Sequence, residues 1–362
     1  MNCVVWFSDF RPDHAPLLGG KAASLGTMTV AGMPVPPGFA LTTEAYEVVQ
    51  GSPEVRKAIE GALAALDAGD LAGLADVSRE LRQVVEAADV PGEIEDCVHE
   101  GYARLAEMCG DPQIPVAVRS SATSEDLPDA SFAGEHDSYM WVQGADKVLL
   151  MIRRCWSSLF TERAIAYRQQ MGYPHDAVLM SVAVQKMARP KASGVAFTLN
   201  PRDGDRSQVA IDAAWGFGEG VVAGEVTPDN YLVDKVLYEI TKRHVSAKEC
   251  EYRLGEHGVE RMPLTDERRD QPCLTDDEIR AVARLARAAE KHYGCPQDVE
   301  WAIDTDLPPE ANVLLLQSRP ETVWSRKPVT PVGGHGDFMQ SIVATLTSPL
   351  HTKSKTDTEV GQ

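Results

Sequence analysis

Residues 116–134 read VAVRSSATSEDLPDASFAG, and this stretch is the most informative one in the chain. A short apolar strand over residues 116–118 is expected to deliver Arg119 to its end. A guanidinium group offers a rigid fork of donors that suits phosphate oxygens. The small hydroxyl residues and backbone amides that follow can cradle the same anion. The stretch therefore favours a phosphate-binding site over its plainer alternative, a surface turn with an isolated arginine.

A second phosphate-binding segment is suggested near the N-terminus. Residues 17–26, LLGGKAASLG, predict a glycine turn that leads into a helix with Lys21 in its first turn. The free amides and the dipole of a helix N-terminus favour anions, and Gly19 and Gly20 would let the backbone approach closely. The order of residues is not that of a Walker A loop, and by itself the turn also fits a plain N-terminal connection.

A metal site is suggested by two strands expected over residues 295–303 and 313–319. Asp298 and Glu300 share one face of the first strand, and Gln317 and Arg319 share one face of the second. If the strands are neighbours, Glu300 and Gln317 lie side by side. One carboxylate and one amide oxygen, aided by phosphate oxygens, suit Mg²⁺. The alternative is a half-exposed hairpin with its polar residues outward.

Composition narrows the class of protein. A chain of 362 residues suits two domains or one two-lobed domain. Its net charge of −19 disfavours nucleic acid, but a small phosphate ligand could still bind at local cations, which points to Lys21, Arg119 and Arg319. No apolar run approaches the length of about 20 residues that a membrane span needs, and the first residues do not resemble a signal peptide. No membrane partner and a cytoplasmic location are therefore expected.

The seven cysteines are scattered and include no Cys-x-x-Cys pair. This pattern argues against a disulfide framework and against a structural zinc site. Residues 53–109 and 148–170 are expected to be helical. Strands are expected from residue 178 onward, and a capping box at residues 275–278 should open a helix that runs to residue 293.

Taken together, these segments resemble the N-terminal nucleotide-binding portion of the phosphoenolpyruvate synthase and pyruvate phosphate dikinase family, over about residues 3–325. Each motif is weak alone, but all of them occur in the family's order. The motifs are GGK (19–21), VRSSATSEDL (118–127), SFAG (131–134), VQKM (184–187), GVAFT (194–198), GFGEG (216–220), GEVTPD (224–229), DVEW (298–301) and QSRPET (317–322).

The resemblance implies an α+β fold of the ATP-grasp type, in which two lobes clamp ATP. The N-terminal lobe would span residues 1–182, with a helical insert at about 53–109. The C-terminal lobe would span residues 183–326. Residues 327–362 would form a tail or linker, either disordered or used to dock a partner.

The resemblance also implies roles for individual residues. Lys21, Arg119 and Arg319 would be catalytic, with Arg319 stabilising the phosphoryl group in flight. Glu300 and Gln317 would hold Mg²⁺. The residues expected to bind ATP are Lys21 and Arg119 at the triphosphate, Ser131, Phe132, Ala133 and Gly134 in a loop that closes over the phosphates, Gln185, Lys186 and Met187 along the adenine edge, and Glu219.

The chain departs from the family pattern after Arg319. Only about forty residues follow it, and none of the nine histidines lies in the family's phosphohistidine motif. The resemblance therefore implies a separate partner subunit that carries a phosphorylatable histidine. ATP would end as AMP and phosphate, and the phosphoryl group would pass to a small acceptor. A phenol or cresol is expected, as in phenylphosphate synthase, with pyruvate or a rifamycin-type antibiotic as the family's other acceptors.

Two other functions remain open at this stage. An ATP-grasp ligase would form an acyl-phosphate and yield ADP, so that the nucleotide product separates it from a dikinase. A non-catalytic ATP-sensing module would bind ATP without phosphorylating any partner.

Overall fold

The computed structural model describes residues 3–64, 66, 71–123, 126–127, 130–131, 137–174, 178–256 and 258–324. The chain divides into two units, Met1–Glu321 and Thr322–Gln362, and the second is described only as far as Trp324. The expected tail over residues 327–362 therefore lies outside the described residues. All the elements below belong to the first unit.

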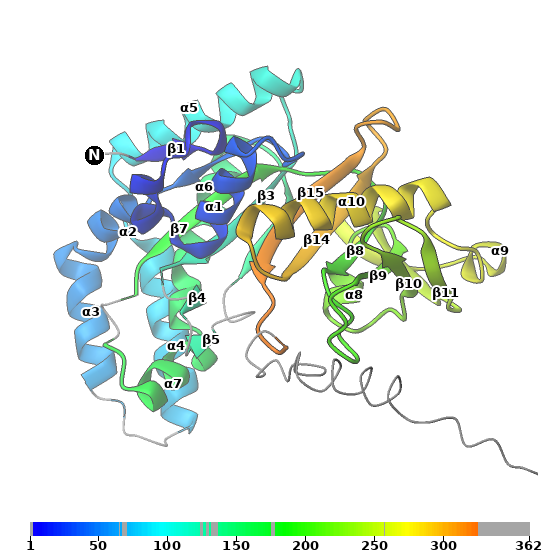
Figure 1. The fold of residues 1–362 in the computed structure, drawn as a ribbon. Coiled ribbons are helices and arrows are strands. Elements are labelled where there is room, and N and C mark those ends of the chain that lie inside the picture. Colours follow the sequence, from blue (N-terminus) through cyan, green and yellow to red (C-terminus); the bar gives the residue numbers. More distant parts are fainter. Residues whose placement is uncertain are drawn as a thin grey trace, which may run out of the picture. The chain divides into compact units, whose positions relative to one another are not determined.

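The first sheet has five strands in the order β1-β2-β7-β3-β6, and every neighbouring pair is antiparallel (Figure 1). Its strands are β1 (Val4–Trp6), β2 (Gly38–Leu41), β3 (Val116–Ala122), β6 (Ser138–Val142) and β7 (Met180–Lys186). Between β3 and β6 the chain also forms the short pair β4 (Asp126–Leu127) and β5 (Ala130–Ser131). Strand β3 is longer than expected, so Arg119 lies in its middle rather than at its end.

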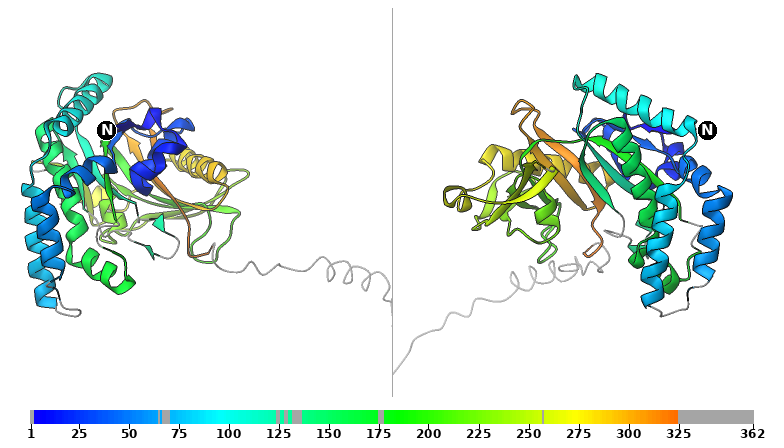
Figure 2. Two further views of the ribbon diagram at one scale, coloured as in Figure 1. Left: turned by 90° about the vertical axis from the view of Figure 1, so that its left-hand side faces the viewer. Right: turned by 180° about the vertical axis from the view of Figure 1, so that it is seen from behind.

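Both faces of this sheet are covered, because alternate side chains of β7 are apolar and buried on opposite faces. Val182 and Val184 point into one hydrophobic core and Ala183 into another, because successive side chains of a strand face opposite sides. The first core is covered by helices α2 (Thr43–Gln50), α3 (Pro53–Ala64), α4 (Leu71–Ala87), α5 (Gly92–Cys109), α6 (Ala145–Ser157) and α7 (Glu162–Met171). Helices α3, α4 and α5 account for the helical insert expected at 53–109 (Figure 2).

The single helix expected over residues 148–170 is in fact two helices, which corrects the prediction. Helix α6 passes into the 3₁₀ turn Ser158–Phe160, and α7 then begins after Thr161. Thr161 has extended backbone angles, and its side chain accepts a hydrogen bond of 3.2 Å from the amide of Ala164. This N-cap stabilises a new helix start and so interrupts the longer helix.

The second sheet has six antiparallel strands in the order β11-β10-β9-β8-β14-β15. Its strands are β8 (Pro190–Phe197), β9 (Gln208–Trp215), β10 (Asp229–Asp234), β11 (Ile240–His244), β14 (Gln297–Asp304) and β15 (Val313–Pro320). Helix α10 (Asp276–Tyr293) lies along this sheet (Figure 1) and begins with the expected capping box between Thr275 and Glu278.

Helix α1 (Ala15–Val30) joins the two halves of the molecule. Its Leu18 and Ala22 share one buried core with Ala183 of the first sheet and with Trp301 of the second. The boundary expected between residues 182 and 183 falls inside β7, so the first sheet extends four residues beyond it.

Smaller elements complete the second half. The hairpin β12 (Cys250–Gly255) and β13 (Gly258–Pro263) packs beside the short helix α8 (Glu219–Val222), and α9 (Asp266–Arg269) follows the hairpin. Gly216 has a φ of +71°, and a side chain there would collide with the carbonyl of Tyr252. Glycine is therefore required where the two segments meet.

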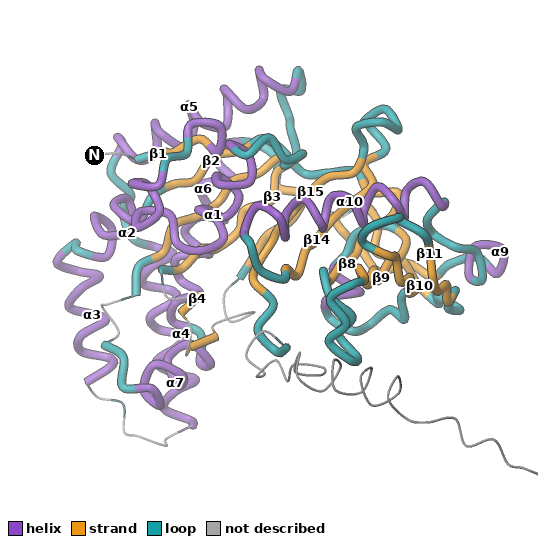
Figure 3. Tube along the Cα trace, in the orientation of Figure 1, coloured by secondary structure: helices purple, strands orange, loops and turns teal. Residues whose placement is uncertain are grey.

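The protein contains both helices and strands (Figure 3), and its two large sheets are antiparallel throughout, which agrees with the expected α+β class. Among the described residues, none of the helices combines the length and the apolar character that a membrane span requires.

Candidate functional site

Arg119 connects the two sheets at the centre of the site. Its side chain leaves β3 and reaches β14 and β15, where Nη2 donates a hydrogen bond of 2.6 Å to Oε1 of Gln317. The same nitrogen lies 3.4 Å from Oε2 of Glu300, and Nη1 donates to the carbonyl of Leu316 at 3.1 Å. Only 12% of the Arg119 side chain is exposed. The guanidinium is therefore held by three oxygens from the neighbouring sheet.

A β-bulge makes one of these oxygens available. In the β14–β15 ladder Glu300 pairs with Gln317 and Trp301 pairs with Leu315, so that Leu316 has no partner on β14. A bulge bends its strand and re-aims the groups within it. The carbonyl of Leu316 is the one that accepts the hydrogen bond from Arg119.

The expected pairing of the polar residues on these strands is confirmed. Glu300 lies directly opposite Gln317, and Asp298 lies directly opposite Arg319. A carboxylate and an amide oxygen on adjacent strands match the preference of Mg²⁺ for hard oxygen ligands. Among the described residues, no three His, Cys, Asp or Glu side chains gather into a metal-binding group. A metal here would therefore take its remaining ligands from phosphate oxygens and water, as Mg²⁺ commonly does.

Arg319 forms an ion pair with Asp298, with Nε and Nη2 at 2.8 and 2.7 Å from Oδ2. The arginine is half-exposed and the carboxylate is nearly buried. Burial raises the pKa of Asp298, and the charge and hydrogen bond of Arg319 oppose that rise. The guanidinium of Arg319 is thus oriented by one carboxylate and keeps an exposed side.

A cavity of about 440 Å³ adjoins this cluster and is lined from both sheets. Most of its lining is apolar, and its charged residues are two cations and two acids. The lining residues are Ala117, Arg119, Met140, Gln185, Lys186, Met187, Ala188, Pro190, Ser193, Gly194, Phe217, Gly218, Glu219, Val222, Ala223, Glu300, Trp301, Ala302 and Leu316. A pocket of this size, mostly apolar with a few charged groups, is typical of a small-molecule site.

The cavity collects many of the residues expected from the sequence, but not all of them. Six of the expected residues line it: Arg119, Gln185, Lys186, Met187, Glu219 and Glu300. Lys21, Gln317 and Arg319 do not line it. Phe132, Ala133 and Gly134 lie outside the described residues, and only the backbone of Ser131 is described, in β5.

Lys21 lies just after a kink in α1. Gly19 has φ 63° and ψ 176°, so the helical turn that contains Lys21 starts anew after it, as expected. Burial raises the pKa of the Cys155 thiol, and the positive charge of Lys21 opposes part of that rise. That thiol contacts the carbonyl of Val118, the residue before Arg119. The lysine is therefore close to the strand that carries Arg119.

The two serines after Arg119 are buried inside the protein, which corrects the expectation that their hydroxyls cradle an anion. Ser121 Oγ donates to the carbonyl of Leu18 at 2.7 Å and accepts from the amide of Ala22 at 3.0 Å. Ser120 is fully buried. Because β3 continues through residue 122, these hydroxyls turn toward the interior, and Ser121 fastens α1 to the sheet.

The end of β7 forms one wall of the cavity. The amide of Lys186 donates to the carbonyl of Pro37, and the amide of Met187 donates to the carbonyl of Pro115, both at 2.9 Å. These two N–H groups are therefore engaged within the protein, which limits the expected backbone contacts with adenine to other groups of the segment. Gln185 is buried, and its Nε2 donates to the carbonyl of Pro36 at 3.2 Å.

An aromatic contact links the two sheets beside the cavity. Trp141 of β6 meets Phe217 edge-to-face, with ring centroids 5.9 Å apart, and the guanidinium of Arg189 lies 5.2 Å from the Trp141 ring. Trp141 has a φ of +59°, which is uncommon for a bulky residue. The tryptophan thus contacts one of the residues that line the cavity.

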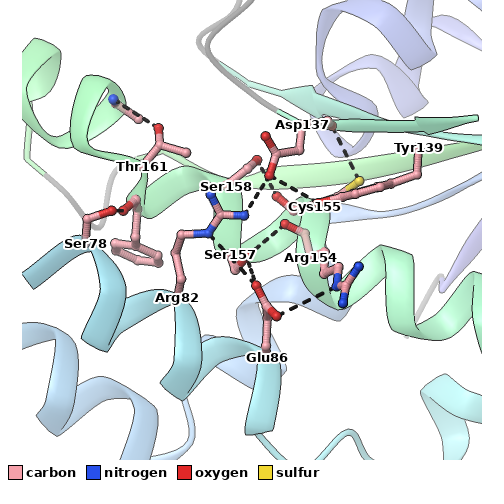
Figure 4. A network of polar contacts seen from close by, with 12 residues as sticks. Ser78, Arg82, Glu86, Asp137, Tyr139, Arg154, Cys155, Ser157, Ser158 and Thr161 are labelled. Atoms are coloured by element: carbon pink, nitrogen blue, oxygen red, sulfur yellow. Dashed lines mark hydrogen bonds and ion pairs between the residues drawn. The ribbon is translucent and has the colours of Figure 1, made fainter. Parts of the chain in front are cut away.

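A polar network fixes the start of β6 against the helices (Figure 4). The carboxylate of Asp137 accepts a hydrogen bond of 2.7 Å from Nη2 of Arg82 in α4, and its carbonyl accepts one from the thiol of Cys155 in α6. The next residue, Ser138, pairs with Arg119 across the β3–β6 ladder. The network therefore supports the strand beside the central arginine.

Sequence reasoning missed the apolar half of the site. Met140, Phe217 and Trp301 line the cavity, but the sequence marks them only as ordinary hydrophobic residues. Phe217 and Trp301 lie inside the motifs GFGEG and DVEW, and this position was the signal that could have placed them near the site. Leu316 contributes through its backbone carbonyl, and the sequence contains no signal that predicts the β-bulge there.

Comparison with known proteins identifies the family and several relatives of this chain. The family described as "Pyruvate phosphate dikinase, AMP/ATP-binding domain" matches residues 15–334. The chain is 41% identical to a probable phosphoenolpyruvate synthase of Methanocaldococcus jannaschii, over 90% of this chain and 27% of that protein. It is 41% identical to a probable phosphoenolpyruvate synthase of Staphylothermus marinus, over 89% of this chain and 41% of that protein.

A phosphoenolpyruvate synthase of Aeropyrum pernix is 38% identical, over 90% of this chain and 43% of that protein. The chain thus spans less than half the length of these relatives, and it matches them along nearly all of its own length.

Proposed function

The chain belongs to the family of the pyruvate phosphate dikinase AMP/ATP-binding domain, and on this premise we propose that it is the ATP-binding unit of a dikinase-type phosphotransferase with an ATP-grasp fold. One observation carries the proposal. Arg119 of the first sheet meets Glu300 and Gln317 of the second beside a cavity of about 440 Å³. A cation from one sheet and two oxygen-bearing side chains from the other thus meet beside the cavity, which supports a site for phosphates and a metal ion.

The nucleotide is proposed to lie with its base against the apolar part of the cavity and its phosphates toward Arg119. Phe217 offers a flat aromatic surface and Met187 an apolar one, and a base can pack against both. The guanidinium of Arg119 can bind phosphate oxygens in a bidentate manner. Lys21 approaches from α1 and would add a second positive charge to the triphosphate.

Glu300 and Gln317 are proposed to hold Mg²⁺, with Asp298 close by on the same face. The bound ion would neutralise phosphate charge and orient the transferring group. Arg319, oriented by Asp298, would stabilise the negative charge that develops during transfer. Phosphoryl transfer depends chiefly on such positioning and charge neutralisation.

Glu219 is proposed to contact the nucleotide from α8. The residue as a whole is exposed, but partial loss of solvent around its carboxyl group raises its pKa. Ser131, Phe132, Ala133 and Gly134 are proposed to close over the phosphates.

The phosphoryl group is proposed to pass to a histidine carried by a partner subunit or by a further region of a longer chain. The β-phosphoryl would go to the histidine and the γ-phosphate to water, so that ATP ends as AMP and phosphate. The acceptor would be phenol or cresol, or pyruvate. The relatives' name, phosphoenolpyruvate synthase, supports pyruvate at least as strongly as a phenol.

Two measurements test this function. Calorimetric titration with Mg-ATP should give a heat of binding that Arg119→Gln reduces and that the remote Arg243→Gln leaves unchanged. The chain should then be mixed with a histidine-domain protein encoded beside it and with ATP, and the nucleotide product identified. AMP would support a dikinase, ADP would indicate a ligase, and binding without turnover would favour an ATP sensor. An absence of any binding heat would refute the proposed function.

A further inference from the structure

The guanidinium of Arg119 occupies a set of oxygens that also suits a divalent cation. Its neighbours are the carbonyl of Leu316 at 3.1 Å, Oε1 of Gln317 at 2.6 Å and Oε2 of Glu300 at 3.4 Å. A carbonyl, an amide oxygen and a carboxylate are the ligand types that Mg²⁺ and Mn²⁺ take from proteins. The same oxygens cannot bind the guanidinium and a metal ion at once.

We propose that Arg119 and the divalent ion compete for these oxygens, and that a triphosphate decides the competition by drawing the guanidinium onto its own oxygens. The inference rests on the proposed function, because it takes Glu300 and Gln317 as the metal ligands. Its consequence is an order of binding. The metal enters together with the nucleotide, and the protein has little affinity for the metal alone.

The charges around the cluster give the physical reason. A metal ion that arrives alone meets a positive guanidinium at the same oxygens, and like charges so close repel strongly at the effective dielectric of a protein site. Moving the guanidinium aside leaves its donors without acceptors in a place where the side chain is only 12% exposed. A triphosphate removes both obstacles, because its oxygens accept the bidentate hydrogen bonds of the guanidinium.

The bulge at Leu316 makes the competition specific to Arg119. The other arginine on this face, Arg319, pairs with Asp298 through both Nε and Nη2. It therefore already has a carboxylate partner of its own. Arg119 instead depends on a carbonyl, an amide and one carboxylate at 3.4 Å, so it can be displaced without separating a close ion pair.

The test measures Mn²⁺ binding to the full chain without nucleotide, by electron paramagnetic resonance of the free ion. Arg119→Gln should bind Mn²⁺ about tenfold more tightly than the wild type, because a positive charge is removed from the ligands. Glutamine keeps one donor for the Leu316 carbonyl, which favours normal folding. The matched control is Arg243→Gln, which removes the same charge from β11 at the opposite edge of the sheet and should leave the affinity unchanged.

Two further measurements sharpen the result. The double variant with Arg119→Gln and Glu300→Gln should lose the gain, because the freed carboxylate is absent. Mg-ATP affinity, measured by calorimetry, should change in the opposite direction and fall about tenfold in Arg119→Gln, because the phosphates lose their bidentate partner. Removal of a merely structural arginine would weaken both affinities together.

The competition is overturned if Arg119→Gln binds Mn²⁺ no more tightly than the wild type, or if Arg243→Gln gains as much. Should thermal melting show that Arg119→Gln is unfolded, Arg119→Met, which also removes the positive charge, replaces it. The same gain of about tenfold is expected, and no gain overturns the proposal. The Mn²⁺ titration contains no nucleotide, so a failure to bind Mg-ATP would refute the proposed function without deciding the competition.

Discussion

Oε1 of Gln317 accepts a hydrogen bond of 2.6 Å from Nη2 of Arg119, although 198 residues separate the two in sequence. This contact joins the central part of the first sheet to the edge strand of the second. It brings the arginine of the most informative motif to the residues expected to hold a metal ion. The contact therefore draws the proposed nucleotide site from both halves of the chain.

Arg319→Ala is expected to separate binding from chemistry. The Arg319 side chain is about half-exposed, so the substitution should leave the fold intact and change the Mg-ATP affinity by less than about threefold. Phosphoryl transfer to the histidine partner should fall by at least about a hundredfold, because the guanidinium acts on charge that develops during transfer. Calorimetry and quenched-flow measurement of AMP formation check the two parts. Transfer at the wild-type rate would remove Arg319 from the mechanism.

Glu300→Gln is expected to weaken the dependence of ATP binding on metal. The substitution keeps the shape of the side chain and an oxygen for Arg119, but it removes the negative charge that favours a divalent ion. The Mg²⁺ concentration for half-maximal ATP binding should rise about tenfold. Glu310→Gln, in the exposed turn of the same hairpin, is the matched control and should titrate like the wild type. An identical titration in the two variants would dispose of Glu300 as a ligand.

Gly19→Ala is expected to destabilise the protein and to disrupt ATP binding. With φ 63° and ψ 176°, the residue adopts a conformation that is almost confined to glycine. A Cβ there would also collide with the carbonyl of Ser121 and lie 2.7 Å from that of Ala122. The free energy of unfolding should fall by about 3 kcal/mol in urea denaturation.

Gly32→Ala serves as the comparison for this glycine. It also has a positive φ, of 76°, but a Cβ there would meet nothing within 4 Å. Its cost should therefore be only about 1 kcal/mol. Equal losses in the two variants would mean that the contact between α1 and β3 does not require glycine.

Glu278→Gln is expected to lower stability in a pH-dependent way. Burial would raise the pKa of Glu278, but hydrogen bonds from Lys191 at 2.7 and 2.8 Å and from the Thr275 amide at 2.7 Å outweigh burial and lower it below 4.5. The stabilisation is thus complete above pH 4.5 and is lost as the pH falls through the lower value of the folded state.

At pH 7 this variant should be less stable by about 1–2 kcal/mol. The difference from the wild type should shrink as the pH falls below 4.5, as measured by urea denaturation across the pH range. Asp277→Asn, which changes an exposed acid in the same helical turn, is the matched control and should change stability much less at pH 7. A difference for Glu278→Gln that is constant with pH would contradict the assigned ion pair.

Several parts of the fold could be predicted because they depend on local rules. The alternation of a strand placed Asp298 with Glu300 and Gln317 with Arg319, and antiparallel pairing then set these residues opposite one another. The capping box at Thr275 marked the start of α10 because its hydrogen bonds span only three residues.

Other parts were not predicted, either because two local signals compete or because the contacts involve residues distant in sequence. Residues 148–170 carry one helical pattern, yet the helix is interrupted at Thr161. The N-cap geometry of this residue starts a new helix and so competes with continuation of the first. The hydroxyl of Ser121 resembles a phosphate ligand by its position after Arg119. In the folded chain it binds Leu18 instead, because α1 packs against β3.

The amino-acid sequence by itself determined the α+β class, the family and the polar residues that pair on β14 and β15, because periodicity, capping and motif order are properties of neighbouring residues. Only the tertiary structure decided that Arg119 lies within a strand and reaches Glu300, Gln317 and the bulged carbonyl of Leu316. Those contacts depend on how two sheets pack, and that packing is set by a buried core drawn from both halves of the chain.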